Sequence, residues 1–353
     1  MWRRITISLA AIAGTMLGLE LLLRTLPVST ATLTGYYFDK DVLTYPAHHE
    51  WWVSTGWSLR NPQHLRSNNY GFVSALDFQS DPRALALIGD SYVEASMLDA
   101  ADRPEAQLQT LLADSRRVYG LGAPGTALLD YAQRIRFANQ SLQITDFVVW
   151  LERGDARQSL CGSGNVHSRC LDPHALAPRV QRRPEPTWVK RIARHSVLAQ
   201  YLFGQLKVDL PAIAAATFRR NVPGEPDTPE ARAAPTVSRG NPPRISDRTV
   251  KVVDTVLDRF FEEIGPYARG RLIFLVDGYR KAAPRKVSEL DLERDYLIQQ
   301  LRARGAEVVD LQPAFEARSS RDGLSLEVGP YDRHLNRLGV RLAMEQAAAQ
   351  LRR

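Results

Sequence analysis

Three residues that together fit a catalytic group lie far apart in the sequence. Ser91 ends the stretch Ile88-Gly89-Asp90-Ser91, and Asp332 and His334 lie near the C-terminus. A histidine suits the role of base for a serine hydroxyl because its unperturbed pKa lies near neutrality. In an extended segment, Asp332 and His334 share one side at a separation of roughly 6–7 Å along the chain, so the carboxylate can orient the imidazole. The three residues predict a serine nucleophile activated for acyl transfer.

Each motif alone also fits a structural role. Asp90 or Ser91 can serve as the N-cap of a following helix, and Asp332 can lie in a turn beside a surface His334. The other six histidines lie in loop or helical contexts where we expect no acidic partner of this kind: His48, His49, His64, His167, His174 and His195. Only the combination of the two motifs points to catalysis.

From residue 84 onward, apolar strands alternate with helical stretches. We expect strands at 84–88, 117–121, 146–151, 271–276 and 306–311. Helical spacing covers 91–113, 126–141, 247–264, 288–304 and 337–351. Strands that are apolar throughout and separated by helices indicate a parallel sheet covered on both faces. The prediction is a doubly wound, three-layer α/β domain of flavodoxin-like type, whose ligands bind at the carboxyl ends of the strands.

The N-terminus has the features of a membrane anchor. Arg3 and Arg4 precede an apolar run from Ile5 to Leu23, interrupted only by small or hydroxyl residues and Glu20. At about 1.5 Å per residue, this run reaches roughly the thickness of a bilayer core. The basic residues place the N-terminus in the cytoplasm and the rest across the membrane, with the Glu20 carboxylate near the far interface. An uncleaved anchor is favoured, and a cleaved signal or a buried helix of a soluble protein remains open.

The chain divides into an anchor (1–28), an irregular lead-in (29–80) and an α/β domain (81–350) with an insert at 173–246. In the lead-in, we expect Trp51, Trp52 and Trp57 to fix the segment to the main core rather than to hold sugar rings. Residues 186–218 look helical and amphipathic, which fits either a cap or a position near the membrane. The proline-rich stretch 221–246 predicts a loop without regular structure.

The two cysteines, Cys161 and Cys170, bracket a stretch rich in turn-forming residues. In an oxidising compartment, this spacing predicts a local disulfide that pins a loop; two unpaired thiols are the alternative. Two cysteines are too few for a zinc-finger quartet. His167 between them, without a carboxylate, is weak support for a metal, so we expect neither a metal nor a cofactor.

Together these motifs resemble the SGNH/GDSL hydrolase superfamily. The resemblance rests on Gly89-Asp90-Ser91 after the first strand, Gly122 and Gly125 after the second, and Asp332-x-His334-Leu-Asn before the last helix. The anchor and the segment Asn69-Tyr-Gly-Phe72 resemble, more narrowly, its membrane-anchored bacterial branch, which includes polysaccharide and peptidoglycan O-acetylesterases and O-acetyltransferases. The resemblance covers roughly residues 66–160 and 247–350.

By position, the resemblance makes Ser91 the nucleophile, His334 the general base and acid, and Asp332 the orienting carboxylate. The oxyanion hole falls to the backbone amides of Ser91 and Gly122. The family's third donor is an Asn in Gly-x-Asn-Asp, but here the stretch reads Trp150-Leu-Glu-Arg-Gly-Asp155, and Gly154 takes the Asn position. Loss of one donor typically costs about 10²–10³ in rate, so either another group such as Arg153 substitutes, or the enzyme is slow or has lost activity. The residues expected to contact substrate are Asp90, Arg153, Asp155 and Asn336.

The resemblance implies a serine-dependent acyl ester hydrolase that removes O-acetyl groups from an envelope carbohydrate polymer. Two alternatives stay open. One is an O-acetyltransferase component that works with a multi-span membrane acyltransferase; the other is a non-catalytic carbohydrate-binding or assembly protein of the same fold. The expected location is the inner membrane, crossed once by residues 5–23, with the main domain in the periplasm.

Composition excludes few of these functions. The chain has 353 residues, a net charge of +7 and a pI near 9.5, and its basic surplus is mostly arginine spread thinly. We find no Lys/Arg block interleaved with aromatic residues, so we expect no nucleic-acid partner. The motifs G-x-x-x-x-G-K-S/T and G-x-G-x-x-G follow none of the predicted strands, which argues against a phosphate-binding loop.

Overall fold

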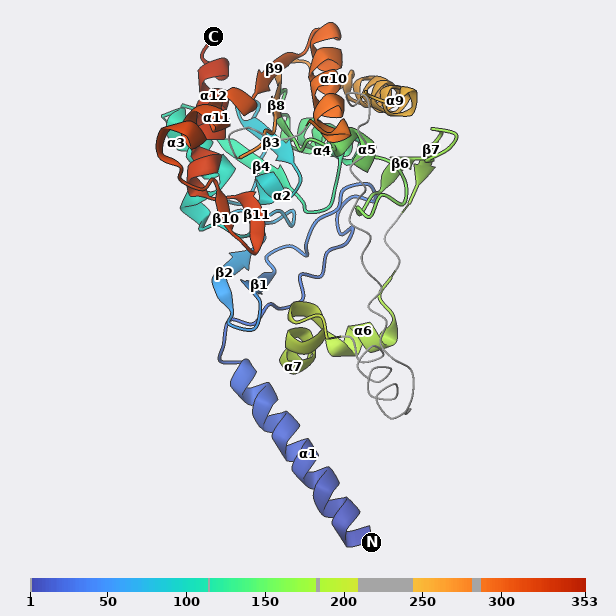
Figure 1. The fold of residues 1–353 in the computed structure, drawn as a ribbon, viewed down its shortest axis with the longest axis vertical. Helices are drawn as coiled ribbons and strands as arrows, with labels where there is room; N and C mark the ends of the chain where they lie inside the picture. The colour runs from blue at the N-terminus through green and yellow to red at the C-terminus, as the bar shows by residue number, and fades with distance from the viewer. Residues whose placement is uncertain (1, 114, 182–184, 209–243, 281–286) are drawn as a thin grey trace.

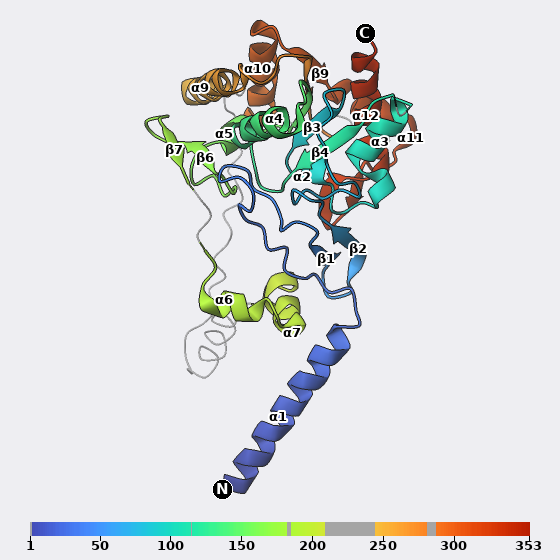
Figure 2. The same cartoon turned by 180° about the vertical axis from the view of Figure 1, so that it is seen from behind.

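The computed structural model describes residues 2–113, 115–181, 185–208, 244–280 and 287–353 (Figures 1 and 2). At its centre lies a parallel sheet of five strands in the order β4-β3-β5-β8-β9. The strands are β3 (Leu85–Gly89), β4 (Val118–Gly122), β5 (Asp146–Leu151), β8 (Leu272–Val276) and β9 (Glu307–Asp310). This is the order of a flavodoxin-like, doubly wound sheet, so the predicted fold class is confirmed.

Successive side chains of the strands point to opposite faces of the sheet, and each face has its own helices. Ile88, Leu121 and Val149 pack with one group of helices, and Leu87 and Val148 pack with the other. The first group comprises α4 (Leu128–Leu142), α9 (Asp247–Ile264) and α10 (Glu289–Ala303). The second comprises α3 (Pro104–Leu111), α11 (Gln312–Asp322) and α12 (Arg337–Leu351). Strands β3, β4, β5 and β8 are almost wholly apolar because both of their faces are buried, whereas the edge strand β9 is half-buried and carries Glu307 and Asp310.

The predicted helix at 91–113 is wrong as one element. The structure has a short α2 (Ser91–Glu94), a 3-10 turn η1 (Ala100–Asp102) and then α3. Ala95 ends α2 in a left-handed conformation (φ 45°), with its amide bonded to the carbonyl of Ser91. Pro104 starts α3, where its missing amide costs nothing. Helix α11, which the sequence analysis did not predict, likewise begins with a proline in its first turn.

The lead-in is not irregular throughout. Strands β1 (Glu50–Thr55) and β2 (Arg60–Arg66) form an antiparallel hairpin. Trp51 is buried against Tyr45, Leu65 and neighbouring apolar residues in a small separate cluster, whereas Trp57 is 76% exposed. The prediction that the tryptophans fix the lead-in to the main core is therefore wrong: Trp51 packs into a cluster of the lead-in itself, and Trp57 packs into none.

The chain begins with α1 (Trp2–Leu23), a helix long and apolar enough to cross a membrane. The insert contains α6 (Trp188–Ala193), α7 (Val197–Ala199) and a π-helix, η2 (Gln200–Gln205). Figures 1 and 2 show α7 beside the C-terminal end of α1 and α6 beyond α7, on the side of the molecule away from α10 and α12. The loop predicted at 221–246 lies, apart from its last three residues, outside the described residues, as does the end of the helical stretch 186–218.

Two short elements follow β5, namely α5 (Asp155–Gln158) and β6 (Arg169–Leu171), and β6 pairs with β7 (Pro178–Val180) of the insert. The last short hairpin precedes α12. The final hairpin pairs β10 (Glu327–Gly329) with β11 (Asp332–Leu335). Cys161 and Cys170 form the predicted disulfide, which closes the loop before β6.

Candidate active site

Ser91 is the first residue of α2, directly beyond the carboxyl end of β3. The turn leaves no room for a larger residue at Gly89, where an added Cβ would lie 2.6 Å from Val93 Cγ2. The Asp90 side chain caps α2 by accepting a hydrogen bond of 2.9 Å from the Tyr92 amide. As the first helical residue, Ser91 has a backbone amide without an intrahelical partner. The serine therefore stands at the edge of the sheet with a free helix-end amide beside its hydroxyl.

The β10–β11 hairpin carries the other two residues to Ser91. The Ser91 hydroxyl lies 2.8 Å from His334 Nε2, and His334 Nδ1 lies 2.6 Å from Asp332 Oδ1. The same carboxylate oxygen accepts the His334 amide at 2.9 Å, which fixes it against its own strand. With Nδ1–H directed to Asp332, Nε2 is left to accept the serine proton. The structure thus brings together the three residues that the sequence predicted, in the order acid, imidazole, hydroxyl.

The electrostatics of the pair suit a base. Burial opposes both charges, but the hydrogen bonds and the charge of His334 outweigh it at Asp332, whose pKa is lowered. At His334 burial likewise opposes protonation, yet the hydrogen bond and charge of Asp332, helped by Asp90 and Glu94, raise its pKa above 6.5. An ionised Asp332 therefore stabilises the imidazolium that forms when Ser91 loses its proton.

Gly122 ends β4 next to this turn. An added Cβ would lie 2.2 Å from the Glu94 amide nitrogen, so only glycine lets β4 approach α2 so closely. The Ala123 amide donates to Gly89. Because amides alternate in direction along a strand, the Gly122 amide points away from β3, outside that ladder. That this amide and the Ser91 amide form the oxyanion hole stays a prediction.

The third predicted donor, Gly154, does not fit that role. Its amide donates 2.8 Å to Glu152 Oε2, which also accepts from Gln158. Asp155 is fully buried and accepts from the Tyr131 hydroxyl and the Glu152 amide, so it is a structural residue rather than a substrate contact. The stretch after β5 folds as a short turn in which Glu152 accepts from the Gly154 amide and Asp155 accepts from the Glu152 amide.

The other predicted substrate contacts also have structural partners. Asp90 is 7% exposed and caps α2. Asn336 caps α12 through its carbonyl oxygen, and its amide nitrogen donates to the carbonyls of Ser325 and Glu327. Arg153 lies over the ring of Tyr279 at 4.2 Å. Asn336 still lines a surface groove beside the β10–β11 hairpin, called the catalytic hairpin below because it carries Asp332 and His334, but its hydrogen-bonding groups hold this hairpin in place.

Sequence reasoning missed Arg280 and Tyr92. Arg280 donates 2.6 Å to the Tyr92 hydroxyl and pairs with Asp277 at 3.0 Å, and the Tyr92 ring lies 5.6 Å from the His334 ring. Burial raises the pKa of Asp277 to about 6, although Arg280 and Arg153 act in the opposite direction. Their place in the sequence could have indicated Asp277 and Arg280, because both follow the strand predicted at 271–276 and ligands bind at the carboxyl ends of such strands. Asp277, Arg280 and Tyr92 line the site on the side of β8.

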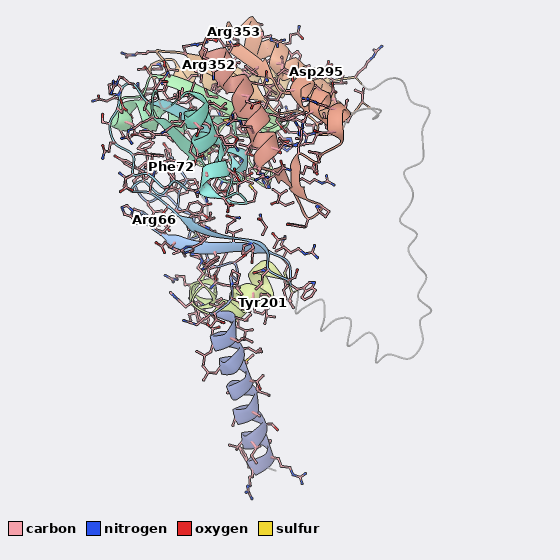
Figure 3. All side chains as sticks on the ribbon, turned by 90° about the vertical axis from the view of Figure 1, so that its left-hand side faces the viewer. Arg66, Phe72, Tyr201, Asp295, Arg352 and Arg353 are labelled. Atoms are coloured by element: carbon pink, nitrogen blue, oxygen red, sulfur yellow. A yellow bond between two sulfur atoms is a disulfide. The ribbon has the colours of Figure 1, made fainter. Side chains whose placement is uncertain are left out.

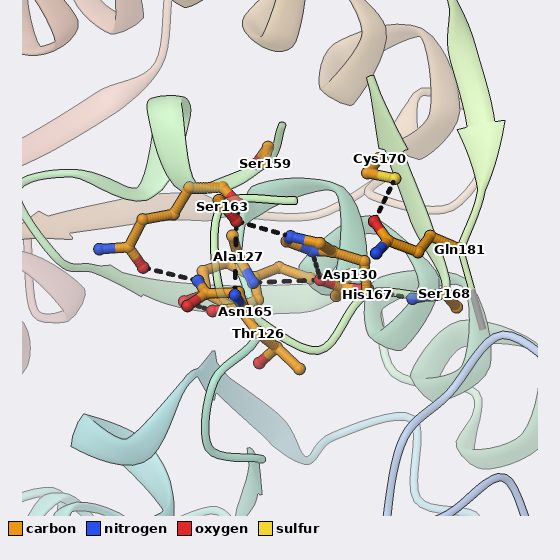
Figure 4. A network of polar contacts seen from close by, with 12 residues as sticks. Thr126, Ala127, Asp130, Ser159, Ser163, Asn165, His167, Ser168, Cys170 and Gln181 are labelled. Atoms are coloured by element: carbon orange, nitrogen blue, oxygen red, sulfur yellow. Dashed lines mark hydrogen bonds and ion pairs between the residues drawn. The ribbon is translucent and has the colours of Figure 1, made fainter. Parts of the chain in front are cut away.

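A second chain of serine, histidine and aspartate lies in the disulfide loop (Figure 4). Ser163 Oγ lies 3.0 Å from His167 Nε2, and His167 Nδ1 lies 3.0 Å from Asp130. The expectation that His167 has no acidic partner is therefore wrong. His167 is 1% exposed, and the Ser163 hydroxyl also bonds the Gln158 carbonyl at 2.8 Å, so this chain fastens the loop to α4.

Neither ring nitrogen of His167 is left for a metal. Among the residues that the structure describes, no group of three or more His, Cys, Asp or Glu side chains could hold a metal ion.

No protein-family model matches the chain, and no curated protein matches it. Among solved structures, it is similar to a lipolytic G-D-S-L family protein from Veillonella parvula (TM-score 0.40, 12% identity, covering 76% of this chain and 98% of that one). It is also similar to a catalytic mutant of an acetylxylan esterase from Geobacillus stearothermophilus (TM-score 0.40, 13% identity, 78% and 96% covered). A lipase/acylhydrolase from Enterococcus faecalis has a TM-score of 0.39 at 12% identity, with 76% and 95% covered. G-D-S-L proteins, the group that the motifs resemble, are thus among the solved structures similar to this chain.

Proposed function

We propose that the chain is a serine acyl ester hydrolase of SGNH type that removes O-acetyl groups from an envelope carbohydrate. The observation that carries the proposal is the continuous hydrogen-bonded chain from Asp332 through His334 to Ser91. It ends at a helix N-terminus, where amide dipoles favour a developing negative charge.

In the proposed reaction, His334 Nε2 takes the Ser91 proton while Oγ attacks the ester carbonyl. The amides of Ser91 and Gly122 hold the tetrahedral oxyanion. Collapse of this intermediate breaks the ester bond, and His334 returns the proton to the leaving sugar hydroxyl, which leaves an acyl-serine. Water then attacks with the help of His334, releases acetate and restores Ser91. Asp332 stays ionised throughout and stabilises the imidazolium.

A groove of about 430 Å³ beside the catalytic hairpin supports a carbohydrate as the substrate. Its wall combines amide and hydroxyl groups of Asn61, Gln63 and Ser325 with apolar surface from Met97 and Val328. Such a mixture suits sugar rings, which present hydroxyls at their edges and C–H groups on their faces. We propose that the polymer lies along this groove with its acetyl ester at Ser91.

We also propose that α1 anchors the chain in the inner membrane, with the α/β domain on the periplasmic side. Support comes from the length and apolarity of α1, from Arg3 and Arg4 before its apolar run, and from the disulfide, which suits an oxidising compartment. A substrate in the envelope then lies on the same side as the site.

The test is hydrolysis of p-nitrophenyl acetate and labelling by a fluorophosphonate probe, in wild type and Ser91→Ala. Ser163→Ala is the matched control because Ser163 belongs to the second, structural Ser–His–Asp chain. We expect Ser91→Ala to abolish labelling and lower the rate by at least about 10³-fold, and Ser163→Ala to retain both. Equal labelling of wild type and Ser91→Ala would contradict the proposal.

A transferase that works with a membrane partner is the second candidate, because the same three residues serve transfer and hydrolysis. Gly154 at the Asn position favours a non-catalytic binder instead, since with two backbone donors rather than three either reaction is expected to be slow. Acetylated polysaccharide with an added sugar acceptor separates the two reactions: free acetate marks an esterase and acetylated acceptor marks a transferase. Unchanged polymer with folded protein marks a binding protein or a transferase without its membrane partner.

A further inference from the structure

Helix α6 presents an apolar face for which the described residues provide no cover. Trp188, Val189 and Ile192 are 67%, 55% and 64% exposed. At 100° per residue these three side chains fall within one sector of about 100°, while Lys190 falls opposite this sector and Arg191 falls at its border, about 60° from Trp188. A short helix with tryptophan and aliphatic residues on one face and basic residues outside that face has the composition of an interfacial membrane helix.

The segment that follows α6 is fastened to α1. The Glu20 carboxylate accepts hydrogen bonds from Ser196 Oγ (2.9 Å) and from the amides of Val197 (3.0 Å) and Leu198 (2.9 Å). Arg24 donates to the His195 carbonyl at 3.2 Å. Figure 3 shows Tyr201 beside the C-terminal end of α1, and both views of the ribbon place α7 there, with α6 next to α7 on the side away from α1. The insert therefore contacts the N-terminal helix at one height, that of Glu20 and Arg24.

That height coincides with the edge of the membrane. From Ile5 to Leu23 the helix rises about 28 Å, close to the roughly 30 Å of a hydrocarbon core. Glu20 lies less than one helical turn before Leu23, so the groups that it binds lie at the outer boundary. Because His195 and Ser196 directly follow the end of α6, that helix lies at the level of the lipid headgroups.

We propose that α6 docks on the outer surface of the membrane that α1 crosses. Trp188, Val189 and Ile192 enter the boundary between headgroups and acyl chains, and Lys190 and Arg191 bind anionic phospholipid headgroups. This rests on the proposed membrane anchor but not on the esterase activity. A second point of contact prevents the domain from rotating freely about α1 and keeps the catalytic hairpin at a constant distance from the bilayer.

The experiment uses the full chain in nanodiscs of zwitterionic and anionic phospholipid. Because the native cysteines are paired in a disulfide, a single added cysteine can carry an environment-sensitive fluorophore. The positions are Val189→Cys in α6, Val180→Cys in β7 and Leu9→Cys in α1, which are 55%, 63% and 61% exposed. Val180 is the matched control because it is an equally exposed valine on a strand far from α1 in Figure 1. Nitroxide-labelled lipid is the quencher.

We expect strong quenching at positions 189 and 9 and almost none at 180, with quenching at 189 reduced when the anionic lipid is left out. Quenching at 9 with equal, weak quenching at 189 and 180 would overturn the docking of α6 and leave the anchor in place. No quenching at 9 would overturn both the anchor and the docking. Ester hydrolysis measured on the same samples reports the proposed enzyme activity independently of these outcomes.

Discussion

At the scale of single residues, Asp332 has two effects on His334: it fixes the tautomer and raises its pKa. Replacing Asp332 with Asn keeps the size of the side chain but offers an N–H to Nδ1, which favours the wrong tautomer. We expect kcat for ester hydrolysis to fall by about 10⁴-fold, and labelling of Ser91 by fluorophosphonate to slow in proportion. A rate within a few-fold of wild type would show that Asp332 does not orient the base.

Asp90 affects the pH profile without being in the proton-transfer chain. Its pKa is raised to about 7, chiefly by burial, and when ionised its charge raises the pKa of His334. Asp90→Asn keeps the helix cap and removes that charge. The pKa of His334 then falls, so the neutral imidazole persists to lower pH. We expect the acid limb of kcat/KM against pH to move to lower pH.

The control for this shift is Asp81→Asn, because Asp81 accepts the Arg83 amide as Asp90 accepts the Tyr92 amide but is absent from the causes of the His334 shift. An acid limb that stays in place in Asp90→Asn, or moves equally in Asp81→Asn, would contradict the proposed influence of Asp90.

The sequence was enough to find Ser91, Asp332 and His334, because each motif is local and lies at a recognisable strand or helix boundary. The sequence was not enough to predict the hydrogen bond between Arg280 and Tyr92, which are 188 residues apart, or the one between His167 and Asp130, which are 37 residues apart. Such pairs depend on how loops pack over the sheet edge, and nothing in either local stretch encodes its partner. The wrong expectations for Gly154 and Asp155 have the same cause, since alignment gives a position but not the contacts made there.

At the scale of elements, the contact between β4 and α2 sets the position of the nucleophile. Gly122→Ala would place a Cβ 2.2 Å from the Glu94 amide nitrogen, against backbone that cannot yield without moving α2. We expect a loss of about 1–3 kcal/mol in unfolding free energy. We also expect kcat/KM to fall by roughly 10²-fold, because displacing Ser91 by about 1 Å misaligns it with His334.

Gly120→Ala in the same strand is the matched control. There the added Cβ would meet only the flexible Glu105 side chain, at 3.2 Å. We expect this variant to keep near wild-type kcat/KM, measured alongside thermal unfolding. Equal losses of activity in the two variants would show that the strand tolerates no larger residue at all, and that α2 is not specifically involved.

Elements whose pattern follows from burial were predictable. The five strands of the central sheet were predicted to within one residue at each end, and α9 and α12 match their predicted ranges. A strand buried on both faces is mostly apolar, and a helix buried on one face repeats its apolar residues with the helical period, so both patterns are visible in the sequence. The β1–β2 hairpin and the break after α2 were not predictable. The hairpin buries little besides Trp51 and Leu65, and the break depends on the left-handed Ala95, a conformation without a sequence marker.

At the scale of the whole molecule, the chain combines the apolar helix α1, long enough to cross a membrane, with a sheet domain, and the insert and the lead-in that join them contact each other. Gln205 of the insert accepts from the Ser29 amide and donates to Ser54 and Gly56 of the lead-in, and Tyr201 donates to the Trp57 carbonyl. The sequence indicated a helical insert either as a cap or near the membrane. The helical part of the insert lies near the end of α1, whereas its strand β7 pairs with β6 beside the sheet domain, and this arrangement could not be derived from amphipathicity alone.

The connection between α1 and the insert depends on Glu20. Glu20→Leu keeps the apolar run and its length while removing the acceptor for the Ser196 hydroxyl and for the Val197 and Leu198 amides. We expect α7 to lose its contact with α1, because part-buried amides that lose their acceptor favour local opening. Hydrogen exchange of the full chain in nanodiscs should accelerate at Val197 and Leu198, while exchange in β3 and β5 stays unchanged.

Thr15→Ala is the control, since the Thr15 hydroxyl bonds only within α1, to Ala11. Unchanged exchange in Glu20→Leu would mean that the lead-in, through Gln205 and Tyr201, suffices to hold the insert at the membrane edge.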